Sequence, residues 1–281
     1  MRRYLIVAIV AVLPACSKKS APPGTTGASM TDTPVTIVAT DSGFVLPDTL
    51  HSGLNHIVYE NHGSEIHECH FIRLPEGMST ADYVAEVKKD VLFPAGALDC
   101  SGPGLTSPGE RVEMWFSLDE GNYLVGCWMA NHMTTRRPVG IVVHGTPAKP
   151  VEPPHEDVTV RMIDFRYEFL GKLKRGDQII RYETVGPSMH ETDIVRLADG
   201  RKMEDVKAWF KDQHKAMPGV IGGGCLDSHD LKHMVWMRRT FEPGRYVFWC
   251  DMPMMQTAAP QDTTKEVTHA DAGMYQEVKI D

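Results

Sequence analysis

An internal repeat constrains the fold of this 281-residue chain more than any other feature. Residue identities recur at a constant offset of 123 positions, the separation of Val35 from Val158, and the offset still holds at Cys127 and Cys250. One offset kept over roughly ninety residues is not expected by chance. Other identities at this offset are Asp41 and Asp164, Gly53 and Gly176, His67-Glu68 and His190-Glu191, Gly121 and Gly244, and Tyr123 and Tyr246.

The repeat predicts two homologous domains, over residues 34–146 and 157–281. A chain of this length, with 42% hydrophobic residues, is long enough for two ordinary domains with their own cores. Residues 147–156 are rich in proline, and we interpret them as a stiff linker between the domains.

Short apolar runs of alternating polarity, bounded by Gly and Pro, are typical of β-strands in each repeat. One helical insert interrupts each copy, at 79–89 and 203–215, where apolar residues recur at three- and four-residue spacing. Ser79 followed by Asp82 resembles a capped helix start. This pattern predicts an all-β chain of two tandem Greek-key β-sandwiches, each with a short helical insert. The strand-like runs of the first repeat are 35–39, 55–60, 66–74, 111–118, 123–129 and 139–144.

The first sixteen residues have the pattern of an export signal. Arg2 and Arg3 precede an apolar run that is too short to span a bilayer, and Leu13-Pro14-Ala15-Cys16 follows. This segment resembles a lipobox, which implies lipidation of Cys16 and a membrane anchor. Pro14 departs from the usual residue at its position, so ordinary signal cleavage remains the alternative. With either kind of signal processing, we expect the folded part to be exported and to face the periplasm or the cell exterior.

Composition restricts the partners of the mature chain. Residues 17–33 are polar and aperiodic, which predicts a flexible tether. The formal charge is −8, and it becomes two units more negative when Arg2 and Arg3 leave with the signal. Because such a surface repels phosphate backbones, we expect no nucleic-acid partner.

Three candidate metal ligands follow one another at the end of the second repeat. Cys250 ends an apolar run, and His269 and Met274 come later in the order Cys, His, Met. His190 shares its position in the repeat with His67, as Cys250 does with Cys127. A mononuclear blue-copper site needs two imidazoles and one thiolate, with a weak axial thioether.

These motifs resemble the plastocyanin/azurin family of cupredoxins. The segment Tyr246-x-x-x-Cys250, followed by His269-x-x-x-Gly273-Met274, is similar to the ligand loop of that family. The resemblance implies a type 1 copper ion held by His190, Cys250 and His269, with Met274 as the axial ligand. One departure is large, because eighteen residues separate Cys250 from His269 where the family has only a few.

The first repeat matches the ligand pattern only in part. His67, Cys127 and His132 are present, and the spacing of Cys127 and His132 is azurin-like. Arg136 and Arg137 stand where the methionine would follow, and the neighbouring Met133 is wrongly placed for the usual geometry. The first repeat is therefore either a second copper site without its axial methionine or a sandwich that has lost its metal.

Other cysteines and soft ligands have two interpretations each. Cys69 and His70 beside His67 predict either a second metal cluster or ordinary strand packing with alternating side chains. An inter-domain disulfide between Cys100 and Cys225 is the alternative to free thiols. The methionine run Met252, Met254 and Met255 either holds cuprous ion or fills apolar surface.

Two classes of copper enzyme are disfavoured by motifs that the sequence lacks. Multicopper oxidases build a trinuclear centre from His-x-His pairs, and no two of the thirteen histidines are two positions apart. Nitrite reductases use adjacent Cys and His ligands, whereas Trp128 and Asp251 follow the two candidate cysteines.

We therefore expect a membrane-anchored copper protein with one copper ion, or two if both repeats bind. Its expected activity is one-electron transfer to a redox partner protein, without substrate turnover. A copper store or delivery protein, or a metal-free binding module, is the alternative.

Overall fold

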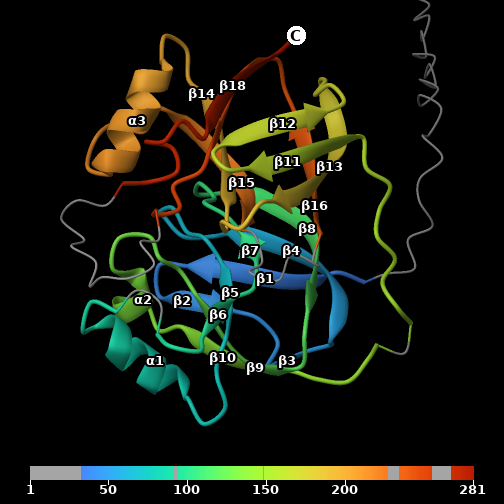
Figure 1. Cartoon of the computed structure of the whole chain (residues 1–281), viewed down its shortest axis with the longest axis vertical. Coiled ribbons are helices and arrows are strands. Elements are labelled where there is room, and N and C mark those ends of the chain that lie inside the picture. The colour runs from blue at the N-terminus through green and yellow to red at the C-terminus, as the bar shows by residue number, and fades with distance from the viewer. Residues whose placement is uncertain (1–32, 92–93, 148, 227–233, 255–266) are drawn as a thin grey trace, which may run out of the picture. The chain divides into compact units, whose positions relative to one another are not determined.

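The computed structural model describes residues 33–91, 94–147, 149–226, 234–254 and 267–281, which belong to one compact unit beginning at Asp32. The predicted signal and lipidation site at Cys16 lie outside these residues. Figure 1 shows strands throughout both repeats and three helices within the part described.

The elements of the first repeat are β1 (Val35–Thr40), β2 (Gly43–Val45), β3 (Thr49–Leu50), β4 (Gly53–Asn61), β5 (His70–Arg73), α1 (Thr80–Val87), β6 (Leu98–Asp99), β7 (Gly102–Pro103), β8 (Arg111–Leu118), β9 (Gly121–Gly126), α2 (His132–Thr135) and β10 (Val139–Val143). Those of the second are β11 (Val158–Ile163), β12 (Arg166–Leu170), β13 (Gly176–Val185), β14 (Glu191–Leu197), α3 (Met203–Lys211), β15 (Gly219–Leu226), β16 (Val235–Phe241), β17 (Gly244–Trp249) and β18 (Tyr275–Ile280). The expectation of an all-β chain with one longer helical insert per repeat is confirmed.

The strands form three sheets. The largest has eight strands in the order β12-β11-β13-β16-β8-β4-β1-β2, so each repeat supplies half of it. A five-stranded sheet, β3-β10-β9-β5-β6, belongs to the first repeat, and another, β18-β17-β14-β15-β7, belongs mainly to the second. In each repeat, the small sheet carries the strands that lead into and out of the candidate ligand loop.

Two strand pairings join the repeats directly. β16 pairs antiparallel with β8, with Trp236 opposite Trp115, and closes the eight-stranded sheet. β7 of the first repeat pairs with β15 of the second, with Pro103 opposite Cys225. The two repeats therefore share backbone hydrogen bonds in two sheets as well as side-chain packing.

The helical inserts begin where the sequence predicts and end earlier. Ser79 caps α1, because its hydroxyl accepts from Asp82 N at 3.1 Å while the Asp82 carboxylate accepts from Ser79 N at 2.9 Å. α1 buries Tyr83, and α3 buries Val206, Trp209 and Phe210. The helices thus cover the small sheets, which carry the candidate ligands.

None of the cysteines in the part of the chain that the structure describes forms a disulfide. The alternative of a Cys100–Cys225 disulfide is therefore wrong. Cys225 is fully buried beside β7, whereas Cys100 is partly exposed and its thiol donates to Leu98 O.

Candidate metal centre

The second repeat brings its three predicted ligands to one buried point. His190 directly precedes β14 and Cys250 directly follows β17, and these two strands pair antiparallel. Cys250 Sγ lies 3.5 Å from His269 Nδ1, and the Nδ1 atoms of His190 and His269 are 3.1 Å apart. His190 and Cys250 are 0% exposed and His269 is 4% exposed. One sulfur and two ring nitrogens therefore face one another without intervening solvent.

The long segment between Cys250 and His269 is closed at its base. Met254 N donates to Val267 O at 2.8 Å, and Ala270 N donates to Cys250 O at 2.9 Å. These hydrogen bonds return the chain to the cysteine whatever the length of the excursion. The departure from the usual loop length therefore does not separate the two residues.

Carboxylate and amide groups around the cluster orient its donors. His190 Nε2 lies 2.8 Å from Asp164 Oδ1, and because a carboxylate only accepts, Nε2 carries the proton. The Nδ1 lone pair of His190 is then free to face the cluster. Glu191 N donates to Cys250 Sγ at 3.4 Å, an interaction that favours the thiolate.

Burial sets the protonation of the metal-free cluster. It raises the pKa of the Cys250 thiol well above its usual value, and the Glu191 carboxylate adds to this effect. Burial and the neighbouring His190 lower the pKa of His269 to about 4. Burial also lowers the pKa of His190, although Asp164 opposes the shift. Both imidazoles are therefore neutral near pH 7, and a metal ion has to displace only the thiol proton.

Met274 lies at the end of the same turn. Its backbone N–H donates to His269 O at 2.9 Å, its carbonyl accepts from Cys250 N at 3.2 Å, and its side chain is fully buried. The residue is thus fixed between the two loop ligands. Two unprotonated imidazole nitrogens and one sulfur form a donor set that fits copper.

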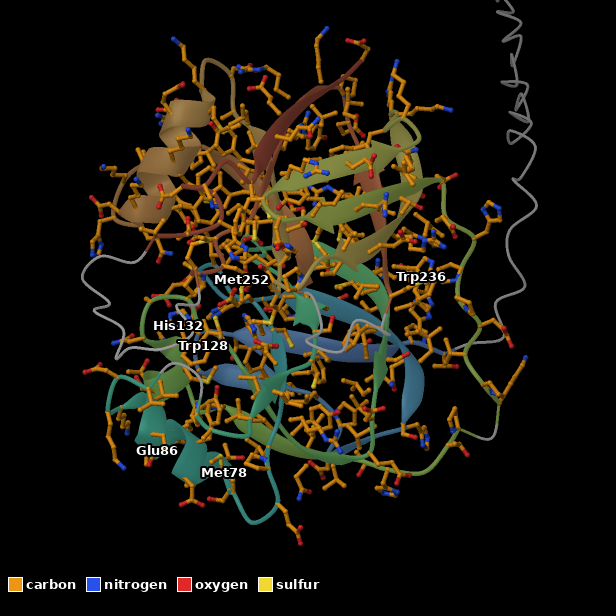
Figure 2. The ribbon with its side chains drawn as sticks, in the orientation of Figure 1. Met78, Glu86, Trp128, His132, Trp236 and Met252 are labelled. Carbon is orange, nitrogen blue, oxygen red and sulfur yellow. The ribbon has the colours of Figure 1, made fainter. Side chains whose placement is uncertain are left out.

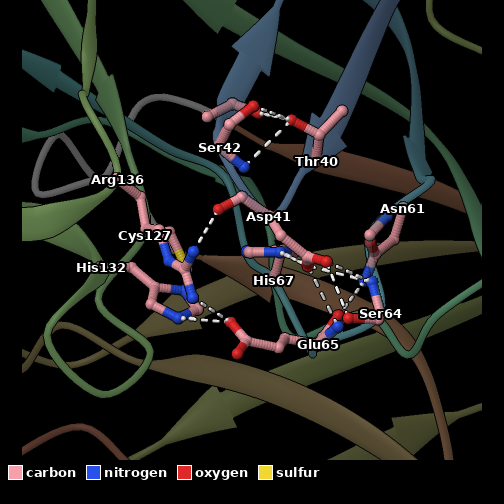
Figure 3. Close-up of polar contacts among 12 residues, drawn as sticks. Thr40, Asp41, Ser42, Asn61, Ser64, Glu65, His67, Cys127, His132 and Arg136 are labelled. Atoms are coloured by element: carbon pink, nitrogen blue, oxygen red, sulfur yellow. Dashed lines mark hydrogen bonds and ion pairs between the residues drawn. The ribbon is translucent and has the colours of Figure 1, made fainter.

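The first repeat forms an equivalent cluster (Figure 3). Cys127 Sγ lies 3.5 Å from His132 Nδ1, and His67 belongs to the same buried group. Glu68 N donates to Cys127 Sγ at 3.5 Å, which repeats the contact of Glu191. His67 Nε2 lies 3.3 Å from Asp41 Oδ1, a longer contact than its counterpart in the second repeat.

Arginines take the place of the axial methionine in the first repeat. Arg136 donates to Asp41 O and to Glu65 Oε2, the latter at 2.7 Å, and His132 Nε2 lies 3.1 Å from the same Glu65 oxygen. Arg137 is exposed. Met133 is buried against Gly126 and the apolar side chains beneath α1. This cluster therefore offers three ligands and a neighbouring positive charge.

The groups that orient the candidate ligands were not predicted as part of the site. The carboxylates of Asp41 and Asp164 and the backbone amides of Glu68 and Glu191 contact candidate ligands, and each pair is kept at the 123-residue offset. That identity between the repeats is the signal that could have found them. The predicted alternative of a cluster of His67 with Cys69 and His70 is not formed, because the groups around His67 contain neither residue.

Comparison with known proteins returns copper proteins at low similarity. No family model and no curated protein matches this sequence. Among solved structures, auracyanin A, a "blue" copper protein from Chloroflexus aurantiacus, is 21% identical over 40% of this chain and 99% of its own, with a TM-score of 0.29. A multicopper oxidase is 15% identical over 88% of both chains, with a TM-score of 0.24. A copper-containing nitrite reductase from Thermus scotoductus is 15% identical over 88% of this chain and 61% of its own, also with a TM-score of 0.24.

These TM-scores are too low to bear on activity, and the neighbours include both electron carriers and enzymes. Function therefore has to be argued from the clusters themselves. Within the described residues, no helix is both long and apolar enough to cross a bilayer.

Proposed function

We propose that this chain is a type 1 copper protein that carries single electrons, with copper held by His190, Cys250 and His269 and with Met274 as the axial ligand. The observation that carries the proposal is the approach of three buried donor atoms, two of them 3.1 Å apart. Copper supplies the one-electron change between its cuprous and cupric states when bound. The protein holds the donors in place and excludes water.

Burial of the ligands favours electron transfer over substrate turnover. His190 and Cys250 are sealed from solvent, and only a small edge of His269 is exposed. Phe165 packs on the His269 ring with centroids 4.8 Å apart and restrains it further. Rigid, enclosed ligands change little between oxidation states, whereas an enzyme needs an open coordination position. A redox partner protein would dock over the His269 edge.

We extend the proposal to a second ion held by His67, Cys127 and His132. The three donors form the same kind of buried group, and Glu68 repeats the amide contact to sulfur. Without an axial methionine, this ion would have three strong ligands. Arg136 is paired with Glu65 Oε2 at 2.7 Å beside His132, so the two charges offset each other there.

The export signal supports a place outside the cytoplasm, with a lipid at Cys16 as the anchor. We expect Cys16→Ser to release the processed protein from membranes, measured by fractionation. Retention of the processed variant in the membrane fraction would contradict the anchor.

Single thiol substitutions test the copper sites. After loading with Cu²⁺, Cys250→Ser and Cys127→Ser should each lose one copper ion and its thiolate charge-transfer colour, because each removes one thiolate. Cys225→Ser is the matched control, since Cys225 is also fully buried but belongs to neither cluster. If only Cys127→Ser loses colour, the working site lies in the first repeat. If the native protein takes up no copper, the chain is a metal-free binding module.

A further inference from the structure

A cavity of about 490 Å³ lies where the two repeats meet. Its lining is built from equivalent positions of both repeats, because Glu68 and Glu191, His70 and Asp193, and Met129 and Met252 are each separated by the repeat offset. Trp128 and Met252, which also line it, are labelled in Figure 2. The cavity therefore belongs to the duplicated architecture and is separate from both sulfur-containing clusters.

The lining carries four buried carboxyl groups, and burial raises the pKa of two of them, Glu191 and Asp193, well above the usual value. Glu68, Asp99, Glu191 and Asp193 are between 2% and 9% exposed, and no Lys or Arg is among the residues that line the cavity in the described chain. Backbone amides bind one oxygen of three of these groups: Trp128 N on Glu68, Asp251 N on Glu191 and Leu105 N on Asp193. Buried carboxylates need a compensating charge beyond such contacts.

His70 is the nitrogen donor in this lining. Its Nδ1 lies 2.6 Å from Asp99 Oδ2, which fixes the proton on Nδ1 and leaves Nε2 as the free donor atom. The ring is 5% exposed, and Nε2 is buried without a hydrogen bond, although Glu68 Oε2 lies 3.3 Å away. Metal-ligating histidines commonly have this arrangement: one ring N–H donates to a carboxylate, which orients the ring, and the lone pair of the other nitrogen binds the metal.

We propose that this cavity binds a divalent transition-metal cation through His70 Nε2 and Glu68 Oε2, with Asp99 as the positioning residue. Two ligands with bonds of about 2.1 Å at tetrahedral to octahedral angles are separated by roughly 3.0 to 3.4 Å, a range that includes the observed 3.3 Å. Glu191 and Asp193 line the same cavity from the other repeat. Mixed imidazole and carboxylate donors favour such ions over Ca²⁺ or Mg²⁺.

A proton is the competitor for the same position. Burial disfavours the imidazolium, but the Asp99 and Glu68 carboxylates outweigh it and raise the pKa of His70 well above its usual value. A protonated His70 would donate to Glu68 and need no metal. Metal binding measured directly separates the two states.

Cobalt binding tests the proposal independently of copper. In a background with His67→Gln, Cys127→Ser, His132→Gln, Cys250→Ser and His269→Gln, neither sulfur-containing cluster remains, and the neighbouring group of Asp41, Glu65 and His67 has lost its imidazole. Co²⁺ uptake then reports on the cavity whether or not the native clusters bind copper. We expect one Co²⁺ per chain, with d–d absorption and no thiolate charge transfer. Adding His70→Ala should weaken binding at least tenfold, and adding Asp99→Asn should weaken it about tenfold.

His56→Ala is the matched control, because His56 is also a 5% exposed histidine, paired with the carboxylate of Glu113 at 3.1 Å, but does not line the cavity. It should leave Co²⁺ binding unchanged. If the background does not fold, as judged by circular dichroism, the Co²⁺ titration is made on the native chain, with cuprous ion added first to fill the sulfur-containing clusters. Any Co²⁺ that still binds to a thiolate is then recognised by its charge-transfer absorption. Absence of Co²⁺ binding, or binding that survives His70→Ala, would overturn the cavity site and leave His70 as an imidazolium.

Discussion

Asp164→Asn tests whether the second repeat positions His190 through its outer nitrogen. The carboxylate lies 2.8 Å from His190 Nε2 and accepts its hydrogen bond. A hydrogen bond to a charged group contributes about 1.5 to 3 kcal/mol. The Asp164 side chain is 26% exposed, so solvent screening places the loss of binding free energy at the lower end of this range. Because about 1.4 kcal/mol is a factor of ten in affinity, we expect Asp164→Asn to bind copper roughly tenfold more weakly.

The assay is competition with a copper chelator of known affinity, in a Cys127→Ser background that leaves only the second cluster. Asp41→Asn, measured in the complementary Cys250→Ser background, is the matched comparison. Its carboxylate is 3.3 Å from His67 Nε2 and also binds Ser64, so we expect a smaller loss. An Asp164→Asn protein with unchanged affinity would refute the orienting role, and a loss above about a thousandfold would exceed any orienting effect.

Three further predictions concern stability, pH and the axial ligand. Asn61→Ala removes three hydrogen bonds of a buried side chain and should lower the free energy of unfolding in urea by about 3 kcal/mol, whereas exposed His62→Ala should change it by less than about 0.5 kcal/mol. Acidifying the metal-free protein from pH 6.5 towards 4 should lower its thermal stability, because His269 takes up a proton near 6.5 when unfolded but only near 4 when folded. His269→Gln should flatten that slope, and an unchanged slope would contradict the assignment. Met274→Leu should keep the copper and raise its reduction potential in a redox titration, and loss of the metal would show a stronger role for Met274.

Local and repeated features of this fold were predictable from sequence. The capping pair of Ser79 and Asp82 involves neighbours along the chain, so it is visible in the sequence. The order of Cys250, His269 and Met274 in the sequence identified three residues that the structure brings together. The type of ligand and its position in the repeat do not depend on the length of the loop between Cys250 and His269, so the long loop did not hide them. The whole of β8, Arg111–Leu118, was also predicted, since it is a short apolar run with Pro108-Gly109 before it and Gly121 after it.

Long-range pairing was not predictable from the same patterns. Periodicity places β8 and β16 as strands but does not say that they pair with each other and join the repeats. The cavity residues were hidden for the same reason, because His70 and Asp99 belong to strands whose neighbours are set by the fold. The side chain of Cys69 lies in the core, and that of His70 lies against Asp99. This alternation separates the two residues, so they do not form one metal cluster with His67.

An anomalous difference map at the copper edge, from crystals of the copper-loaded chain, would locate the bound copper. We expect a peak within bonding distance of Cys250 Sγ and of the Nδ1 atoms of His190 and His269, with a second peak at His67, Cys127 and His132. Copper at neither cluster, or copper bound only at surface histidines, would contradict this expectation.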